Sequence, residues 1–237
     1  MQTSTANPRA TAAGNACRDR ELLIYVGRQG IVSVDHVMTA MAAGRSVTYE
    51  RVARCIEMGL LERHEVLRTE PSVLRATADG LRYAGLGLPV PQISAGRIEH
   101  DLRCASVALK LAETVGLGLV IPEREIAFME QHTGKPFASA EIESSSGRSA
   151  SHRADLAVRV ENGELHAVEV ELTPKAPRRL EEIVRAWRRF RGVNRVVYFC
   201  REGKTYRGVE RAIERTQAGE SVLVRKLVEG ASGDAPS

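Results

Sequence analysis

The sequence predicts a mixed α/β chain, of the α+β type, in which a short linker joins two domains. Up to residue 88, apolar residues recur mainly with helical spacing, and a few short strand-like segments come in between. Residues 89–96 form the linker, because two prolines there interrupt helical periodicity. From residue 97 to residue 228 the predicted order is α-β-β-β-α-β-α-β around a central mixed sheet. A chain of 237 residues, 43% of them hydrophobic, can bury two such cores.

The composition of the chain argues against a membrane protein and against a zinc protein. Residues 1–17 and 229–237 lack periodicity and are predicted to be disordered. No apolar run approaches the ~20 residues that a membrane span needs, so we expect a cytoplasmic protein without a membrane partner. The four cysteines form no CxxC pair and the six histidines form no HExxH motif. We therefore expect no zinc, and no nucleotide cofactor.

Charge is distributed unevenly along the chain, although the net formal charge is only +4. Residues 176–216 contain 12 basic and 5 acidic residues, whereas residues 123–171 contain 10 acidic and 5 basic ones. An acidic centre beside a basic segment suits a metal-dependent phosphodiesterase, because acids hold the cation and bases hold the phosphate backbone. The candidates for phosphate contacts are Arg178, Arg185, Arg188 and Arg189, on exposed arcs of a predicted helix. The alternative is a solvated helix face.

Three helical segments open the first domain. The first spans residues 18–28, the second is capped by Ser33 and ends at Gly44, and the third runs from Ser46 to Gly59. Two strands about a turn at Glu70-Pro71 follow, and Thr77 opens another helix. This order predicts a winged helix-turn-helix over residues 18–88 and looks like the DNA-binding modules of bacterial transcription factors.

The third helix is the predicted DNA-binding element of that domain. It would enter the major groove of duplex DNA and present Thr48, Tyr49, Arg51 and Arg54. The segment is nearly neutral, so the domain alone is expected to bind weakly. A protein-docking role is the alternative.

Three carboxylates converge in the second domain. Asp155 opens one predicted strand, and Glu169 and Glu171 lie on the next strand, after a tight turn at Asn162-Gly163. Because side chains alternate along a strand, Glu169 and Glu171 share one face while Val168 lies on the other. Clustered carboxylates repel one another unless a cation or proton lies between them. Oxygen ligands suit Mg²⁺ or Mn²⁺, so Asp155, Glu169 and Glu171 are the predicted metal ligands.

This order, followed by a basic helix, resembles the PD-(D/E)XK nuclease superfamily. The resemblance implies that these residues are catalytic and bind a metal that supports phosphodiester cleavage. Glu171 stands where the pattern has a lysine, and some members of that superfamily carry Glu there. The nearest lysine is Lys175, which approaches the site only if the chain bends back at Thr173-Pro174.

Over residues 18–228 the chain resembles the replication-relaxation family of actinobacterial plasmids and integrative elements. The resemblance rests on the order of a helix-turn-helix, Glu-Arg-Glu, Arg-Ala-Asp and Glu-Val-Glu. It implies a DNA-binding nuclease or nicking protein acting in plasmid or mobile-element replication or transfer. The alternative is a non-enzymatic DNA-binding regulator or initiation factor with a degenerate nuclease fold. A homodimer is left open.

Two further features lie near the predicted site. Glu125, in Glu-Arg-Glu, ends a short apolar strand and is a candidate for an extra acid. Residues 132–151 are small and polar without a period, which predicts a mobile loop next to the site.

Overall fold

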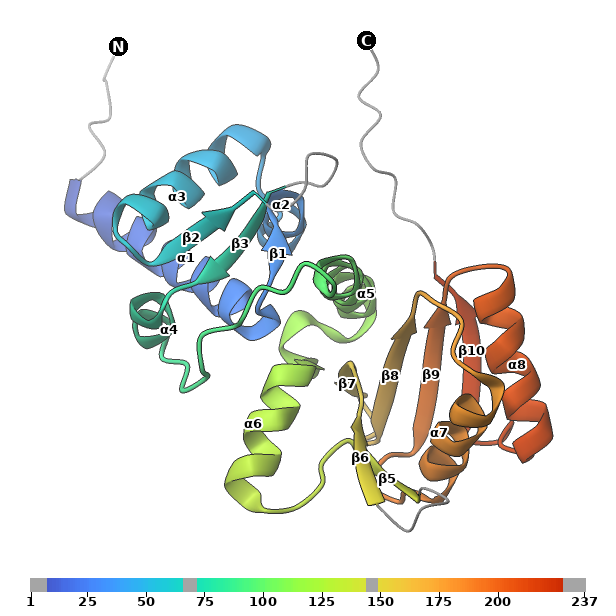
Figure 1. Cartoon of the computed structure of the whole chain (residues 1–237). Helices are drawn as coiled ribbons and strands as arrows, with labels where there is room; N and C mark the ends of the chain where they lie inside the picture. Colours follow the sequence, from blue (N-terminus) through green and yellow to red (C-terminus); the bar gives the residue numbers. More distant parts are fainter. Residues whose placement is uncertain (1–7, 66–71, 144–148, 228–237) are drawn as a thin grey trace. The chain divides into compact units, whose positions relative to one another are not determined.

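The computed structural model describes residues 8–65, 72–143 and 149–227. The chain divides into two compact units, Met1–Ala105 and Ser106–Ser237, and the division falls inside α5 (Ile98–Val115) rather than at residues 89–96. The described part contains eight α-helices and a mixed sheet of five strands, which confirms the predicted mixed α/β class (Figure 1). Among the described helices, none combines the length and apolar character that crossing a membrane requires.

The first unit combines four helices with a small antiparallel sheet. Its elements are α1 (Pro8–Gln29), β1 (Val32–Ser33), α2 (Val34–Met41), α3 (Arg45–Glu57), β2 (Leu61–His64), β3 (Val73–Ala76) and α4 (Ala78–Ala84). The strand order is β1-β3-β2, with β3 pairing antiparallel to both neighbours. The turn predicted at Glu70-Pro71 lies outside the described residues.

Capping side chains begin two of these helices where the sequence predicts. The Ser33 hydroxyl accepts a hydrogen bond from His36 N (3.3 Å), and His36 Nδ1 accepts one from Ser33 N (3.1 Å). Thr77 Oγ1 accepts a hydrogen bond from Gly80 N at the start of α4 (3.0 Å). In contrast, α1 begins at Pro8, inside the segment predicted to be disordered. Proline suits a first helical turn, and alanines favour helix without any apolar period.

His36 is partly buried, and this should make the stability of the first unit depend on pH. Burial lowers the pKa of His36 to about 4, whereas the unfolded chain takes up this proton near pH ~6.5. The stability that neutral His36 contributes is therefore fully present above pH ~6.5. It is lost as the pH falls toward the pKa of the folded state, because the unfolded chain takes up the proton first. We expect the free energy of unfolding to drop by about 2 kcal/mol between pH 7 and pH 5. Denaturant melts of His36→Gln should lack this drop, and an equal drop in the variant would contradict the assignment.

The second unit is built on a five-stranded sheet with the order β10-β9-β8-β7-β4. β4 (Val120–Pro122), β7 (Leu156–Arg159) and β8 (Leu165–Glu171) pair antiparallel, whereas β9 (Arg195–Cys200) and β10 (Val222–Lys226) continue parallel to β8. Gly163 closes the β7–β8 turn with φ +84°, a conformation that favours glycine. The predicted turn at Asn162-Gly163 therefore lies where the sequence indicates.

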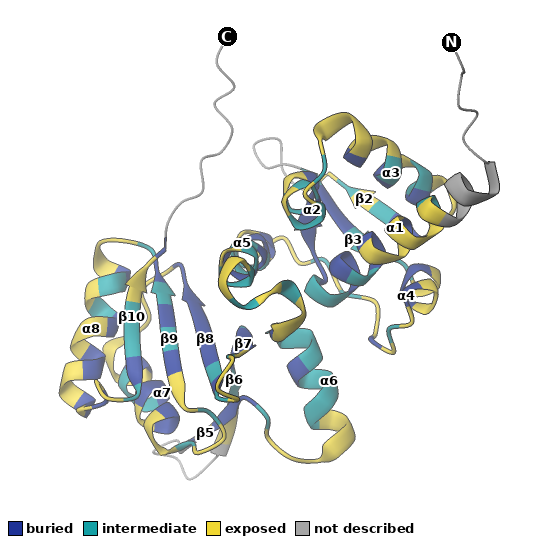
Figure 2. Cartoon of the chain, turned by 180° about the vertical axis from the view of Figure 1, so that it is seen from behind, coloured by how far each residue is buried: buried dark blue, intermediate teal, exposed yellow. Residues whose placement is uncertain are grey.

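Two helices cover one face of this sheet. α7 (Pro177–Arg189) links β8 to β9, and α8 (Lys204–Thr216) links β9 to β10, so each makes the crossover between two parallel strands. Leu180, Ile183 and Trp187 form the buried stripe of α7, and they belong to one core with Ala167 of β8. Figure 2 shows β8 largely in the dark blue of buried residues. Since Ala167, Glu169 and Glu171 alternate onto the same face of β8, the two glutamates point toward these helices.

The structure corrects the predicted loop at residues 132–151. α6 (Glu123–Thr133) extends into it, and the hairpin of β5 (Ser139–Glu143) and β6 (Ser149–Arg153) follows, with residues 144–148 outside the described part. Ala138, Ala140 and Ile142 are buried with a period of two. The small size of the alanines hides this strand pattern in the sequence.

Candidate functional site

The predicted acidic residues lie side by side on β7 and β8. Leu156 pairs with Val168, so Asp155, one residue before β7, comes next to Glu169. The Asp155 carboxylate is fixed there because its Oδ2 accepts a hydrogen bond from Val170 N (2.7 Å). The antiparallel register of β7 and β8 therefore brings Asp155 next to Glu169.

α7 covers the face that carries Glu169 and Glu171. Glu169 is 4% exposed and Glu171 is 6% exposed. Trp187 Nε1 donates a hydrogen bond to Glu169 Oε1 (3.1 Å), so this buried core residue also holds a site residue. No sequence signal points to this contact, because 18 residues separate the two side chains.

His152 of β6 is a further member of the site that sequence reasoning does not assign. Its Nε2 lies 3.0 Å from Glu169 Oε1, an ion-pair distance, although the angle is not that of a hydrogen bond. Burial lowers the pKa of His152, but the Glu169 carboxylate raises it by more, and the net direction is upward. Burial also raises the pKa of Glu169, against the opposing effect of His152. Each group thus favours the charged form of the other, while burial keeps the pKa of Glu169 raised overall.

Lys175 does bend back to the acidic cluster. Its Nζ forms an ion pair with Glu171 Oε2. Its charge also acts on His152 and Glu169. The bend at Pro174 thus places a lysine ammonium beside the position where the nuclease pattern expects one.

The Tyr198 hydroxyl completes the buried part of the site. Tyr198 of β9 pairs with Glu169 in register and is 1% exposed. Burial raises its pKa, and the charges of Glu169, Glu171 and Asp155 raise it further. Within the described part of the chain, its hydroxyl has no hydrogen-bond partner. A buried hydroxyl without a partner is uncommon, and this one lies near the charges of all three predicted acids.

Glu125 lies in the first turn of α6. This turn adjoins the site through the backbone, because Glu123 N donates a hydrogen bond to Asp155 O (2.8 Å). The side chain of Glu125 acts on its neighbour Arg124, whose pKa burial lowers to about 10. A role for Glu125 as an extra acid stays a prediction.

In the first unit, the structure corrects the choice of DNA-facing residues on α3. Thr48 is 2% exposed, and its hydroxyl donates a hydrogen bond to Gly44 O (3.0 Å). Arg54 Nε donates to the buried Asp19 carboxylate of α1 (3.0 Å), and Arg51 Nε lies 3.8 Å from the same carboxylate. Thr48 faces inward, and the two arginines hold α3 against α1.

Tyr49 is exposed, as predicted, and it has two basic neighbours. Arg45, one helical turn earlier, and Arg63 of β2 each place a guanidinium 5.8 Å from the Tyr49 ring. The spacing of Arg45 and Tyr49 by four residues is a signal that sequence reasoning passes over. Arg63 lies on another element, so only the fold brings it there.

The basic side chains of α7 are mostly engaged within the second unit. Arg178 and Arg185 pair with Glu182 and Glu181, at 3.5 Å and 2.9 Å. Arg188 donates a hydrogen bond to Thr216 O of α8 (2.8 Å). Arg189 also has an interaction partner. Their predicted role in phosphate contacts therefore competes with contacts inside the protein.

Comparisons with known proteins do not identify a family. No protein-family model matches the chain, and no curated protein matches it. Among solved structures, protein VC1899 from Vibrio cholerae is similar over 90% of this chain, with 12% identity and a TM-score of 0.30. This chain spans 50% of the length of that protein. A likeness at this score carries no argument about fold or function.

Proposed function

We propose that this chain is a DNA-binding protein of the replication-relaxation type with a metal-dependent phosphodiesterase site. In this proposal the first unit is a winged helix-turn-helix, and the second is a PD-(D/E)XK-like nuclease domain. One observation supports it: Asp155 lies opposite Glu169 in the register of β7 and β8, and Glu171, two residues on, forms an ion pair with Lys175 in the bend that follows β8. Three acids and a lysine at the ends of adjacent strands are what cleavage of a phosphodiester requires.

Each residue has a distinct task in the proposed site. Asp155, Glu169 and Glu171 would hold the divalent cation, which supplies positive charge to the phosphate and makes water more acidic. Lys175 can orient a phosphate oxygen or a water through its ammonium. Trp187 and His152 position the Glu169 carboxylate, and the Tyr198 hydroxyl is available to donate a hydrogen bond within the site.

A second function, a non-enzymatic DNA-binding regulator, is favoured by one specific observation. Glu169 is neutralised by His152 and bonded by Trp187, and Glu171 is neutralised by Lys175. The cluster is thus satisfied by the protein's own side chains, which is the expected state of a site that has lost turnover.

A cleavage assay separates these two functions. Supercoiled plasmid, single-stranded and branched DNA are incubated with the protein and Mg²⁺ or Mn²⁺, in parallel with Glu169→Ala. The enzyme proposal predicts nicked or linear products with the wild type only. Intact substrates under all conditions would favour the regulator.

The DNA-binding proposal is tested on the surface formed by Arg45, Tyr49 and Arg63. Arg45→Ala and Arg63→Ala should each weaken duplex binding by about 1–3 kcal/mol, the range for a contact to a base edge. Arg82→Ala is the matched control, because this exposed arginine of α4 pairs only with Asp79 among the described acids. Gel shifts at several salt concentrations report the affinities. Equal affinity of all four proteins would remove this surface from the DNA interface.

A further inference from the structure

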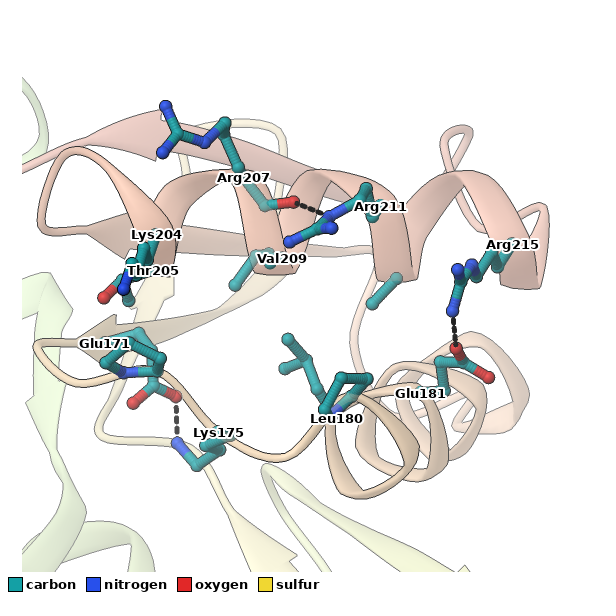
Figure 3. Close-up of a pocket in the computed structure, with 14 residues that line it drawn as sticks. Glu171, Lys175, Leu180, Glu181, Lys204, Thr205, Arg207, Val209, Arg211 and Arg215 are labelled. Atoms are coloured by element: carbon teal, nitrogen blue, oxygen red, sulfur yellow. Dashed lines mark hydrogen bonds and ion pairs between the residues drawn. The ribbon is translucent and has the colours of Figure 1, made fainter.

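A pocket opens between α7 and α8, next to the acidic cluster (Figure 3). Its volume is about 560 Å³, and Glu171 and Lys175 form one end of it. Leu180, Val209 and Ala212 are among its apolar lining residues. The pocket therefore connects the proposed cleavage site with a channel along α8.

One wall of this pocket is a row of cations on α8. Lys204, Arg207 and Arg211 line it, and their spacing of three and four residues places them on one face of the helix. All three are exposed, and none has an acidic partner within the described part of the chain. Arg211 Nε donates only to Arg207 O (3.1 Å). Farther along, Arg215 is paired with Glu181 (3.1 Å), so the row of unpaired charge ends there.

The dimensions of the pocket select its ligand. Lys204 and Arg211 lie about 10 Å apart along the helix axis, which is long enough to face more than one phosphate of an extended chain. α7 and α8 pack directly on each other, since a Cβ built on Gly208 would meet Leu180 Cδ2 at 3.8 Å. A pocket of this volume takes part of a single strand, whereas a duplex cannot enter between two helices that are in contact with each other.

We propose that the channel between α7 and α8 binds single-stranded nucleic acid, with its phosphates along Lys204, Arg207 and Arg211 and its path leading to Glu171. The apolar floor then lies under sugars and bases while the cationic wall faces the backbone. The inference rests on the proposed phosphodiesterase function only for cleavage of the bound strand at the site beside Glu171. Binding in the channel stands on the charges and the shape of the second unit.

The test measures binding in EDTA, where no cleavage occurs. Fluorescence anisotropy measures the affinity for a labelled oligo(dT) strand and, separately, for a duplex of equal length, over a range of salt concentrations. The proteins compared are the full-length wild type and the double variant Arg207→Ala/Arg211→Ala. Losing two phosphate contacts should reduce the slope of log affinity against log salt by about 1.4 for the single strand. The duplex slope should stay unchanged, because the first unit binds duplex.

The matched control is Arg159→Ala/Arg225→Ala, which removes the same charge from exposed positions of the second unit outside the pocket. It should leave the single-strand slope as in the wild type. An equal decrease in this control, an equal decrease for the duplex, or no decrease at all would overturn the proposal. Complete displacement of the strand by thymidine monophosphate at an equal phosphate concentration would also overturn it, since one phosphate would then suffice. Failed cleavage with intact strand binding would instead contradict the proposed enzymatic function.

Discussion

Asp155→Asn is expected to abolish metal-supported DNA cleavage, with a loss of at least ~100-fold, because even residues that only hold metal ligands in place cost up to about 100-fold when they are replaced. The substitution removes the negative charge that a divalent cation needs. Asparagine keeps a side-chain oxygen, so the hydrogen bond from Val170 N can still form. The fold and the binding of duplex DNA should therefore be retained.

Two parallel variants make this result specific. Glu169→Gln should behave as Asp155→Asn, because it also removes a carboxylate of the cluster. Glu164→Gln is the control, since Glu164 is a partly exposed acid that pairs with His166 outside the cluster. Quantified plasmid nicking should leave the control at the wild-type rate. Undiminished nicking by Asp155→Asn would contradict the assignment.

Asp19→Ala is expected to destabilise the first unit by about 3 kcal/mol, the low end of the range for a broken buried ion pair. Asp19 is 5% exposed and holds both Arg51 and Arg54 of α3. Its removal leaves Arg51, with 11% of its side chain exposed, without this carboxylate. The low end of this range applies because the Arg54 side chain is 38% exposed, so water can solvate its charge once the Asp19 carboxylate is gone.

Urea unfolding followed by circular dichroism measures this loss, and Asp79→Ala is its control. Asp79 also pairs with an arginine, but 63% of its side chain is exposed, so its loss should cost no more than ~0.5 kcal/mol. Arg54→Ala should likewise lower stability. If Arg54→Ala instead weakened DNA binding while leaving stability unchanged, the original assignment of Arg54 to the DNA surface would be restored.

Periodicity in the sequence is sufficient to predict how the acidic residues of β7 and β8 are placed. Alternation in β8 placed Glu169 and Glu171 on one face, and the Asn162-Gly163 turn brought Asp155 beside them. Periodicity is local, so it could not indicate that α7 covers this face, or that His152 and Trp187 contact Glu169. Those contacts depend on how separate elements pack.

The same limit explains the errors on α3. The predicted recognition helix points to Thr48, Arg51 and Arg54 by position alone, because a local pattern carries no information on what covers each residue. Asp19, 35 residues before Arg54, binds two of them. Tyr49 is 40% exposed, as its predicted place on the DNA-facing side requires. Its basic partner Arg63 comes from β2, which no local pattern connects to α3.

The most direct test of the metal site is isothermal titration calorimetry with Mn²⁺ on the wild type, Asp155→Asn and Glu164→Gln. The wild type and Glu164→Gln should bind the cation with the same stoichiometry and affinity, and Asp155→Asn should show no binding heat above dilution. The account would be contradicted if the wild type did not bind Mn²⁺, or if Asp155→Asn bound it as tightly as the wild type.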